Sequence, residues 1–217
     1  MTDLRPDFRT PFLAIALVAA LCPTAVAQSQ PQQPQRTPEE YAKFLEGAER
    51  VARMQVSRVV EALGVTPGMK VADIGSGSGL FTRPIAKAAT PGSVYAVDID
   101  QALLNIVARS AKEAGLSNVR TVLGAVGDPN LPEPVDLIFV CDALHHIANQ
   151  GTYLKTLRKY LAPGGRVAVI DFAAKWPGGH ESMHYSADQF ERWMTAAGYT
   201  RVASFDWLDN SFFVVYR

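Results

Sequence analysis

Cysteine is scarce in this chain, which has two among 217 residues, Cys22 and Cys141. If Cys22 leaves with an N-terminal signal peptide, no disulfide can form within the mature chain. Cys141 follows the apolar run Leu137 to Val140, where burial is the usual fate of a cysteine. A structural role for its sulfur is therefore favoured over a nucleophilic one.

An excess of charge of one sign is also missing. Lys plus Arg and Asp plus Glu both number 21, and no block of like charge stands out. A nucleic-acid footprint or an electrostatic membrane patch would require such an excess. We expect no nucleic-acid partner, and large polyanionic substrates are disfavoured.

Long hydrophobic runs are absent too. The apolar run Phe12 to Leu21 is too short to cross a bilayer, which needs roughly 20 residues. Arg5 and Arg9 precede it, and the small-residue triplet 25–27 follows it, which predicts a signal peptide over 1–27 that is cleaved after Ala27. We therefore expect a periplasmic protein without a stable membrane span. Two nearby aspartates weaken the basic region, so an uncleaved N-terminal anchor stays an alternative.

The folded part is expected to begin near Thr37. Residues 28–36 are almost all Gln, Pro and Ser, a composition that predicts an extended linker. The remainder, 37–217, has the size of a single domain. Thr37 is followed by Pro38 and two glutamates, a pattern that predicts the start of a helix. Apolar residues at helical spacing predict that this helix continues to about Leu63. This N-terminal helix (37–64) precedes a core of residues 65–217, and we expect it to close a pocket with Tyr41, Arg50 or Arg53.

Strand and helix patterns alternate through the core. The expected strands are Lys70 to Gly75, Ser93 to Asp98, Val119 to Leu123, Val135 to Asp142 and Arg166 to Phe172. The expected helices are Leu80 to Ala89, Gln101 to Ala114, Thr152 to Leu161 and Ala187 to Ala197. This alternation predicts an α/β, Rossmann-like doubly wound sheet. Two further strands, Arg201 to Trp207 and Phe212 to Tyr216, have so short a link that they must form an antiparallel hairpin.

The glycine-rich segment 75–79 carries the strongest functional signal. It follows an apolar strand and precedes a helix, and its glycines remove the side chains that would keep a ligand away from the backbone. Asp98 ends the next strand, so its carboxylate should arrive beside the glycine turn, where it can bind ribose hydroxyls. An adenosyl cofactor is indicated. Leu80 and Thr82 stand where a dinucleotide fingerprint needs its third glycine, so a nicotinamide-dependent oxidoreductase is disfavoured.

Asp-Ile-Gly-Ser-Gly-Ser-Gly over 73–79, with Val-Asp-Ile over 97–99, resembles the class I S-adenosylmethionine-dependent methyltransferases. The resemblance extends from about Pro67 to the end of the sequence and implies a seven-stranded sheet with an antiparallel C-terminal hairpin. It also implies S-adenosyl-L-methionine as the cofactor. The cofactor-binding residues that we expect are Asp73, Gly75, Ser76, Gly77, Gly79, Asp98, Ile99, Gly124, Ala125 and Asp142. Asp100 is better placed as the N-cap of the following helix.

The third strand end departs from the family pattern. Many members place an aspartate directly after a glycine here to bind the adenine amino group, whereas this chain has Ala125 after Gly124. Either the backbone near Ala125 or Val126 accepts that hydrogen bond, or Asp128 reaches it. We favour the backbone, because Asp128 lies in an ordinary turn sequence.

The fourth strand end supplies the candidate catalytic residues, His145 and His146. A histidine there could remove a proton from an acceptor oxygen or nitrogen during methylation. Asp142 either binds the cofactor ammonium group or orients a histidine. We expect no metal, because His180 and His184 stand in a loop sequence rather than on one helical face. That loop, 174–186, is expected to cover the substrate.

The resulting prediction is methyl transfer to a small-molecule acceptor. The alternative is a non-catalytic protein that binds S-adenosylmethionine or a nucleotide. Export motivates this alternative, because S-adenosylmethionine is made in the cytoplasm and an exported protein would be separated from its supply.

Overall fold

The computed structural model describes residues 36–176 and 178–217, and residues 36–217 form one compact unit. The expected signal peptide and almost all of the expected linker lie outside the described residues. The strands are β1 (Val71–Ile74), β2 (Val94–Asp98), β3 (Val119–Leu123), β4 (Val135–Cys141), β5 (Leu161–Phe172), β6 (Arg201–Phe205) and β7 (Ser211–Tyr216). The α-helices are α1 (Pro38–Leu45), α2 (Ala48–Met54), α3 (Val56–Ala62), α4 (Thr82–Ala89), α5 (Gln101–Glu113), α6 (Gln150–Leu157) and α7 (Ala187–Ala196). Short 3-10 helices are η1 (Leu144–His146), η2 (Arg158–Tyr160) and η3 (Glu181–Met183).

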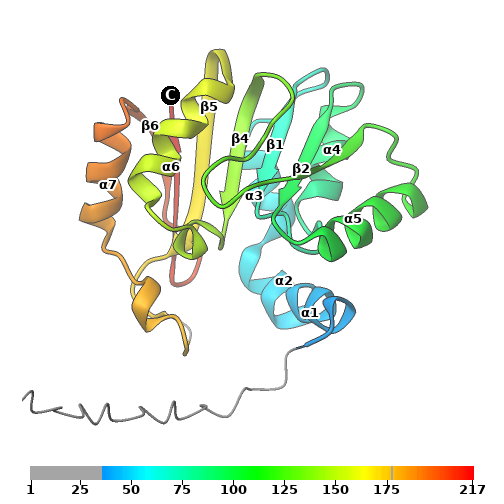
Figure 1. Ribbon diagram of the computed structural model, residues 1–217, viewed down its shortest axis with the longest axis horizontal. Helices are drawn as coiled ribbons and strands as arrows, with labels where there is room; N and C mark the ends of the chain where they lie inside the picture. The colour runs from blue at the N-terminus through cyan, green and yellow to red at the C-terminus, as the bar shows by residue number, and fades with distance from the viewer. Residues whose placement is uncertain (1–35, 177) are drawn as a thin grey trace, which may run out of the picture. The chain divides into compact units, whose positions relative to one another are not determined.

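The strands form one seven-stranded sheet in the order β3-β2-β1-β4-β5-β7-β6 (Figure 1). The first five strands pair in parallel, whereas β7 is antiparallel to both β5 and β6. The predicted doubly wound sheet and C-terminal hairpin are therefore confirmed. The order reverses between β1 and β4, and in such sheets a ligand binds at the carboxyl ends of the strands beside that reversal.

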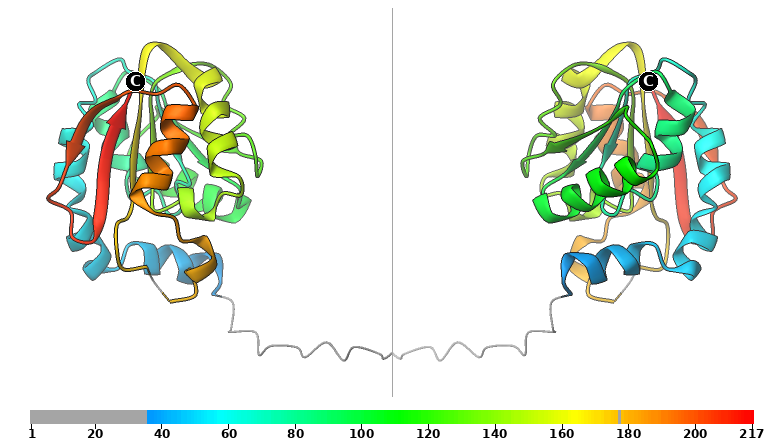
Figure 2. Two further views of the ribbon diagram at one scale, coloured as in Figure 1. Left: turned by 90° about the vertical axis from the view of Figure 1, so that its left-hand side faces the viewer. Right: turned by 90° about the vertical axis from the view of Figure 1, so that its right-hand side faces the viewer.

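Helices cover both faces of the sheet, as Figure 2 shows with α6 and α7 on one side and α3 on the other. One apolar cluster joins α6 and α7 to the sheet, and a second joins α3 and α4 to the opposite face. All four residues of β1 are buried, and so are six of the seven residues of β4. Their sequences are almost continuously apolar because both faces of a parallel sheet are covered. No described helix has the length and apolar character that a membrane crossing demands.

The N-terminal segment differs from the single helix expected over Pro38 to Leu63. It begins as predicted, since the Thr37 side chain accepts a hydrogen bond from the Glu40 N–H and the Glu40 carboxylate accepts one from the Thr37 N–H. Gly47 then separates α1 from α2, and Gln55, at φ 43°, separates α2 from α3. The Gln55 side chain donates a hydrogen bond to the Trp207 carbonyl, 3.0 Å away. Contacts with the rest of the fold therefore override the helical periodicity of the segment.

Candidate functional site

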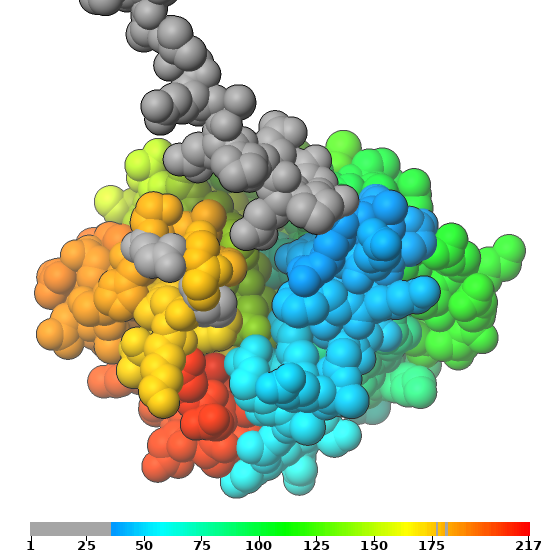
Figure 3. All heavy atoms as spheres, turned by 90° about the horizontal axis from the view of Figure 1, so that it is seen from below, coloured from blue at the N-terminus to red at the C-terminus, as the bar shows by residue number. Residues whose placement is uncertain are grey.

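A cavity of about 480 Å³ lies at the carboxyl ends of β1, β2 and β4. The loops after these strands line it, and Tyr41 and Leu45 from α1 and Arg50 from α2 complete the wall. Figure 3 looks onto this end of the molecule and shows α1 (blue) and the segment after β5 (orange) on two sides of a recess. The N-terminal helices therefore contribute to the pocket as expected, through Tyr41 and Arg50.

The glycine turn after β1 forms the floor of this cavity. Gly75 and Gly77 have φ values of 69° and 53°, which L side chains rarely adopt. A Cβ atom on Gly75 would lie 2.4 Å from the Cβ of Ala143. The Gly77 N–H donates a hydrogen bond to the Asp98 carboxylate, 2.9 Å away. The turn and Asp98 therefore lie together, as the spacing of the sequence predicts.

The other predicted cofactor-binding residues, except Gly79, also line the pocket. They are Asp73, Ser76, Ile99, Gly124, Ala125 and Asp142. Gly79 instead lies against α5, where an added Cβ would be 3.2 Å from Cγ2 of Val107. Its φ of 81° and this close approach to α5 both favour a glycine at this position.

Asp73 is 3% exposed, and its carboxylate accepts a 2.6 Å hydrogen bond from the Thr82 hydroxyl at the start of α4. Burial raises the pKa of Asp73 to about 6, although the Thr82 hydrogen bond opposes this effect. Asp73 thus joins β1 to α4 and holds the two ends of the glycine turn.

Asp142 lies directly after β4 in a left-handed conformation, with φ at 49°. One carboxylate oxygen accepts hydrogen bonds from Arg50 and Arg53 at 3.0 and 3.3 Å. The other oxygen, and the hydroxyl of Ser76, are buried without a hydrogen-bond partner among the described residues. Both residues line the pocket, so this wall suits a ligand that carries hydrogen-bond donors or positive charge. Among the described side chains, Arg50 and Arg53 donate hydrogen bonds to Asp142, and no histidine does.

The opposite end of the pocket is apolar. Ile99 and Val126 line it and are 67% and 68% exposed, which is unusual for large apolar side chains. A flat aromatic ligand between them would cover this surface. Asp128 does not line the pocket, because its carboxylate accepts a 2.6 Å hydrogen bond from the Tyr160 hydroxyl. Gly124, Ala125 and Val126 line the pocket, and the Ala125 backbone pairs with that of Asp128.

The two predicted catalytic histidines separate by environment. His146 lines the pocket, and burial together with the neighbouring His145 and His180 imidazoles lowers the pKa of His146 to about 4. His145 does not line the pocket and is 3% exposed. Its Nδ1 lies 2.8 Å from a carboxylate oxygen of Asp171. His146 is therefore the histidine with access to a ligand.

Asp171, near the end of β5, was not among the residues predicted from the sequence. It is fully buried, and its carboxylate also accepts a 2.8 Å hydrogen bond from the Tyr185 hydroxyl. The sequence does carry a signal for Asp171, which is a single carboxylate at the end of an apolar strand. A charged group in such a buried position needs partners, and this need marks Asp171 as a candidate site residue.

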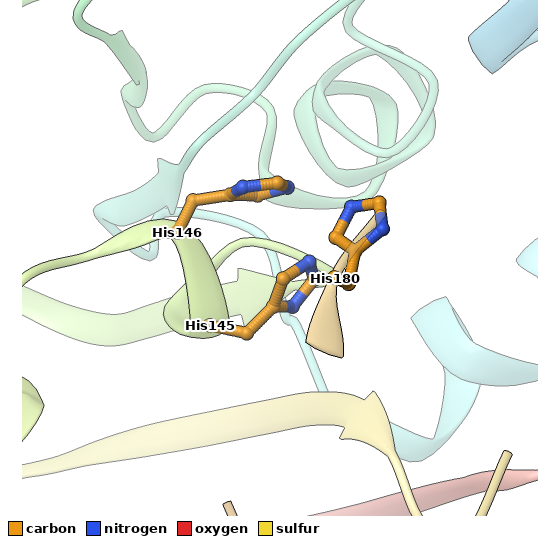
Figure 4. Close-up of side chains that lie close together, drawn as sticks. All are labelled: His145, His146 and His180. Carbon is orange, nitrogen blue, oxygen red and sulfur yellow. The ribbon is translucent and has the colours of Figure 1, made fainter. Parts of the chain in front are cut away.

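A third histidine, His180, joins this pair (Figure 4). Its ring centroid lies 5.2 Å from those of both His145 and His146. The sequence analysis predicted no metal site because it paired His180 with His184. In the structure His180 instead lies with His145 and His146, and His184 is outside this group. The loop after β5 instead brings His180 over η1, with Trp176 against His145 and His184.

A family model described as "Methyltransferase domain" matches residues 71–165. These residues run from the start of β1 into β5 and include the glycine turn, Asp98 and both predicted catalytic histidines.

Among curated proteins, the chain is 32% identical over 113 residues to the ubiquinone/menaquinone biosynthesis C-methyltransferase of Burkholderia cenocepacia (strain HI2424). The match covers 52% of this chain and 46% of that protein. The matched part of the chain thus spans about half the length of the curated relative.

Solved structures share the fold. An S-adenosylmethionine-dependent methyltransferase from Aquifex aeolicus superposes with a TM-score of 0.74 at 23% identity, covering 84% of this chain and 98% of that chain. Magnesium protoporphyrin IX methyltransferase from Synechocystis PCC 6803, solved with S-adenosylmethionine, gives a TM-score of 0.62 at 19% identity and covers 80% and 83%.

Proposed function

We propose that this chain is a class I S-adenosylmethionine-dependent methyltransferase that transfers a methyl group from S-adenosylmethionine to a small-molecule acceptor; the matched methyltransferase model, the curated relative and the shared fold support this proposal. The observation that carries this proposal is the pocket at the reversal of strand order. It combines the glycine turn, Asp98, an apolar end and a buried carboxylate oxygen of Asp142 to which no described residue donates a hydrogen bond.

The residues present fit the proposed cofactor. Asp98 would accept hydrogen bonds from the ribose hydroxyls, and Ile99 and Val126 would cover the adenine. The free oxygen of Asp142 and the Ser76 hydroxyl would bind the polar methionine end. When bound, this cofactor supplies an activated methyl group on a sulfonium centre. The protein then has to align the acceptor and exclude water, and alignment alone contributes roughly 7 to 11 kcal/mol.

His146 is the proposed contact on the acceptor side. It lines the same pocket as Asp142 and stands at the fourth strand end, beside the expected position of the methyl group. A neutral imidazole there accepts a proton from an acceptor that loses one on methylation. The acceptor is proposed to be small because the cavity of about 480 Å³ would have to hold the cofactor as well, and because the chain carries no excess of charge for a polyanion.

Calorimetric titration of the chain from Gln28 to Arg217 tests the cofactor assignment. We expect micromolar binding of S-adenosylmethionine and of its demethylated product, and none of NAD. Asp98→Ala should weaken binding at least tenfold, whereas Asp188→Ala, an exposed carboxylate on α7, should not. If neither adenosyl-sulfur ligand binds, the methyltransferase proposal is wrong.

Export to the periplasm is a separate proposal. Its support is the sequence of residues 1–27, with its basic start, apolar run and small-residue triplet. N-terminal sequencing of the protein from a periplasmic extract should begin at Gln28. An intact Met1 on a cytoplasmic product would overturn it.

A further inference from the structure

We propose that His145, His146 and His180 form a binding site for one divalent transition-metal ion of the Zn²⁺ class. One ring nitrogen of each lies within 4.8 Å of the other two. Three imidazoles are a donor set that suits Zn²⁺, Co²⁺, Ni²⁺ and Cu²⁺ better than Mg²⁺ or Ca²⁺, which prefer oxygen. The metal site rests on this cluster alone. Its use in catalysis, given below, rests also on the proposed methyl transfer.

His145 has the second contact that histidine ligands usually have. Its Nδ1 lies 2.8 Å from the Asp171 carboxylate, and a carboxylate only accepts hydrogen bonds, so Nδ1 carries the proton. The lone pair is then on Nε2, and Figure 4 shows one ring nitrogen of His145 pointing toward His180. Asp171 is itself fixed by Tyr185. Such a carboxylate behind a histidine fixes the tautomer and orients the ring for a metal.

His180 offers an unused nitrogen. Its Nδ1 is buried and has no hydrogen-bond partner in the described part of the chain. A buried polar nitrogen of this kind is costly unless it binds something. The loop that carries it connects β5 to α7, and it places the ring 5.2 Å from both other imidazoles.

The cluster has to contract to bind an ion. Nitrogens at about 2.05 Å from a tetrahedral Zn²⁺ lie about 3.3 Å apart. Because the three nitrogens lie within 4.8 Å of one another, each pair has to approach by at most about 1.5 Å. His145 is held by Asp171, whereas His180 stands in a loop and His146 borders the cavity. Rotation of the latter two side chains supplies the movement.

The position of the cluster suggests its use. His146 belongs both to the cluster and to the pocket wall, so a position left open on the ion would face the cavity. Sites with three protein ligands and one open position are typical of catalytic metals, whereas structural sites are closed. An acceptor oxygen or sulfur would fit that open position. In the metal-bound protein His146 would serve as a ligand and would not accept a proton.

The test uses the full chain without a polyhistidine tag, after treatment with EDTA. We expect calorimetry with ZnCl₂ to show one ion per chain with a micromolar or tighter dissociation constant. CoCl₂ should produce the visible absorption of four-coordinate Co²⁺. His180→Ala should weaken Zn²⁺ binding at least 100-fold and abolish that spectrum. Asp171→Asn should weaken binding 10- to 100-fold.

His184→Ala is the matched control, because His184 is in the same loop but outside the cluster. It should bind Zn²⁺ like the wild type. The proposal is overturned if the wild type takes up no saturable Zn²⁺, or if His180→Ala binds it as tightly as His184→Ala. Titration with S-adenosylmethionine on the same samples, with thermal melts to verify folding, separates this failure from failure of the proposed methyl transfer.

Discussion

The burial of Asp73 leads to a prediction about stability and pH. Asp73 is 3% exposed, and its one side-chain hydrogen bond from the described part of the chain comes from Thr82. Burial raises its pKa from 3.8 to about 6. Each pKa unit corresponds to about 1.4 kcal/mol, so charging this carboxyl costs the folded state about 3 kcal/mol relative to the unfolded chain.

The sign follows from proton binding. Between pH 4 and pH 6 the folded protein binds a proton at Asp73 more readily than the unfolded chain does. The contribution of Asp73 to the free energy of unfolding is therefore highest below pH 4, falls as the pH rises through this window, and is constant above about pH 6. Asp73→Asn removes the charge and keeps an oxygen that accepts from Thr82. Relative to the wild type, this variant should gain up to about 3 kcal/mol between pH 4 and pH 7.

Urea unfolding followed by tryptophan fluorescence measures the effect. The free energies of unfolding of the wild type and of Asp73→Asn are compared at pH 4, 5, 6 and 7. Asp188→Asn controls for loss of a carboxylate at an exposed position. If the wild type and Asp73→Asn keep a constant difference across this range, the argument from burial is refuted.

Three further outcomes are expected. Gly75→Ala should lower the free energy of unfolding by about 1 to 3 kcal/mol, because φ at this position is 69° and the new methyl group would overlap Ala143. The same variant should weaken S-adenosylmethionine binding at least tenfold; urea unfolding measures the first effect and calorimetry the second. Arg50→Ala should destabilise the folded protein by about 1 to 3 kcal/mol, because Arg53 would be the one remaining arginine partner of Asp142. Limited proteolysis should then cut the chain faster between α1 and α2, and equal cleavage rates in the variant and the wild type would contradict this. Cys141 should resist alkylation until the chain unfolds, because burial raises the pKa of its thiol well above the ordinary value, and rapid native labelling mapped by mass spectrometry would oppose this.

The sheet and the cofactor side of the pocket could be predicted from local patterns. The buried strands β1, β2 and β4 are short, mostly apolar runs between helical segments. The five-residue link Asp206 to Asn210 leaves no choice but an antiparallel hairpin. The segment between the glycine turn and Asp98 contains one helix and one strand. The chain therefore returns in parallel beside β1, and Asp98 comes to lie next to the glycine turn. The packing of Gly79 against α5 could not be predicted, because the sequence does not distinguish a glycine that faces a ligand from one that faces a helix.

The acceptor side could not be predicted in the same way. The break at Gln55 depends on a hydrogen bond to Trp207, which is distant in sequence. The contact of His145 with Asp171 follows from the pairing of β4 with β5, which place their carboxyl ends side by side. His180 joins them through the path of a loop, for which helical or strand periodicity gives no signal.

The place of β7 in the sheet affects the order in which the protein is completed. This strand lies between β5 and β6, and within the described sheet β6 has β7 as its neighbour. As the chain is synthesised, β6 therefore has no sheet edge to join until residues 211–216 exist, and the apolar residues Phe213 and Val215 leave the core unfilled until then. A nascent or truncated chain that ends before Ser211 would expose the edge of β5 and remain a target for chaperones and proteases. The outer part of the sheet, β7 and β6, can therefore pair with β5 only after the segment up to Tyr216 has been synthesised.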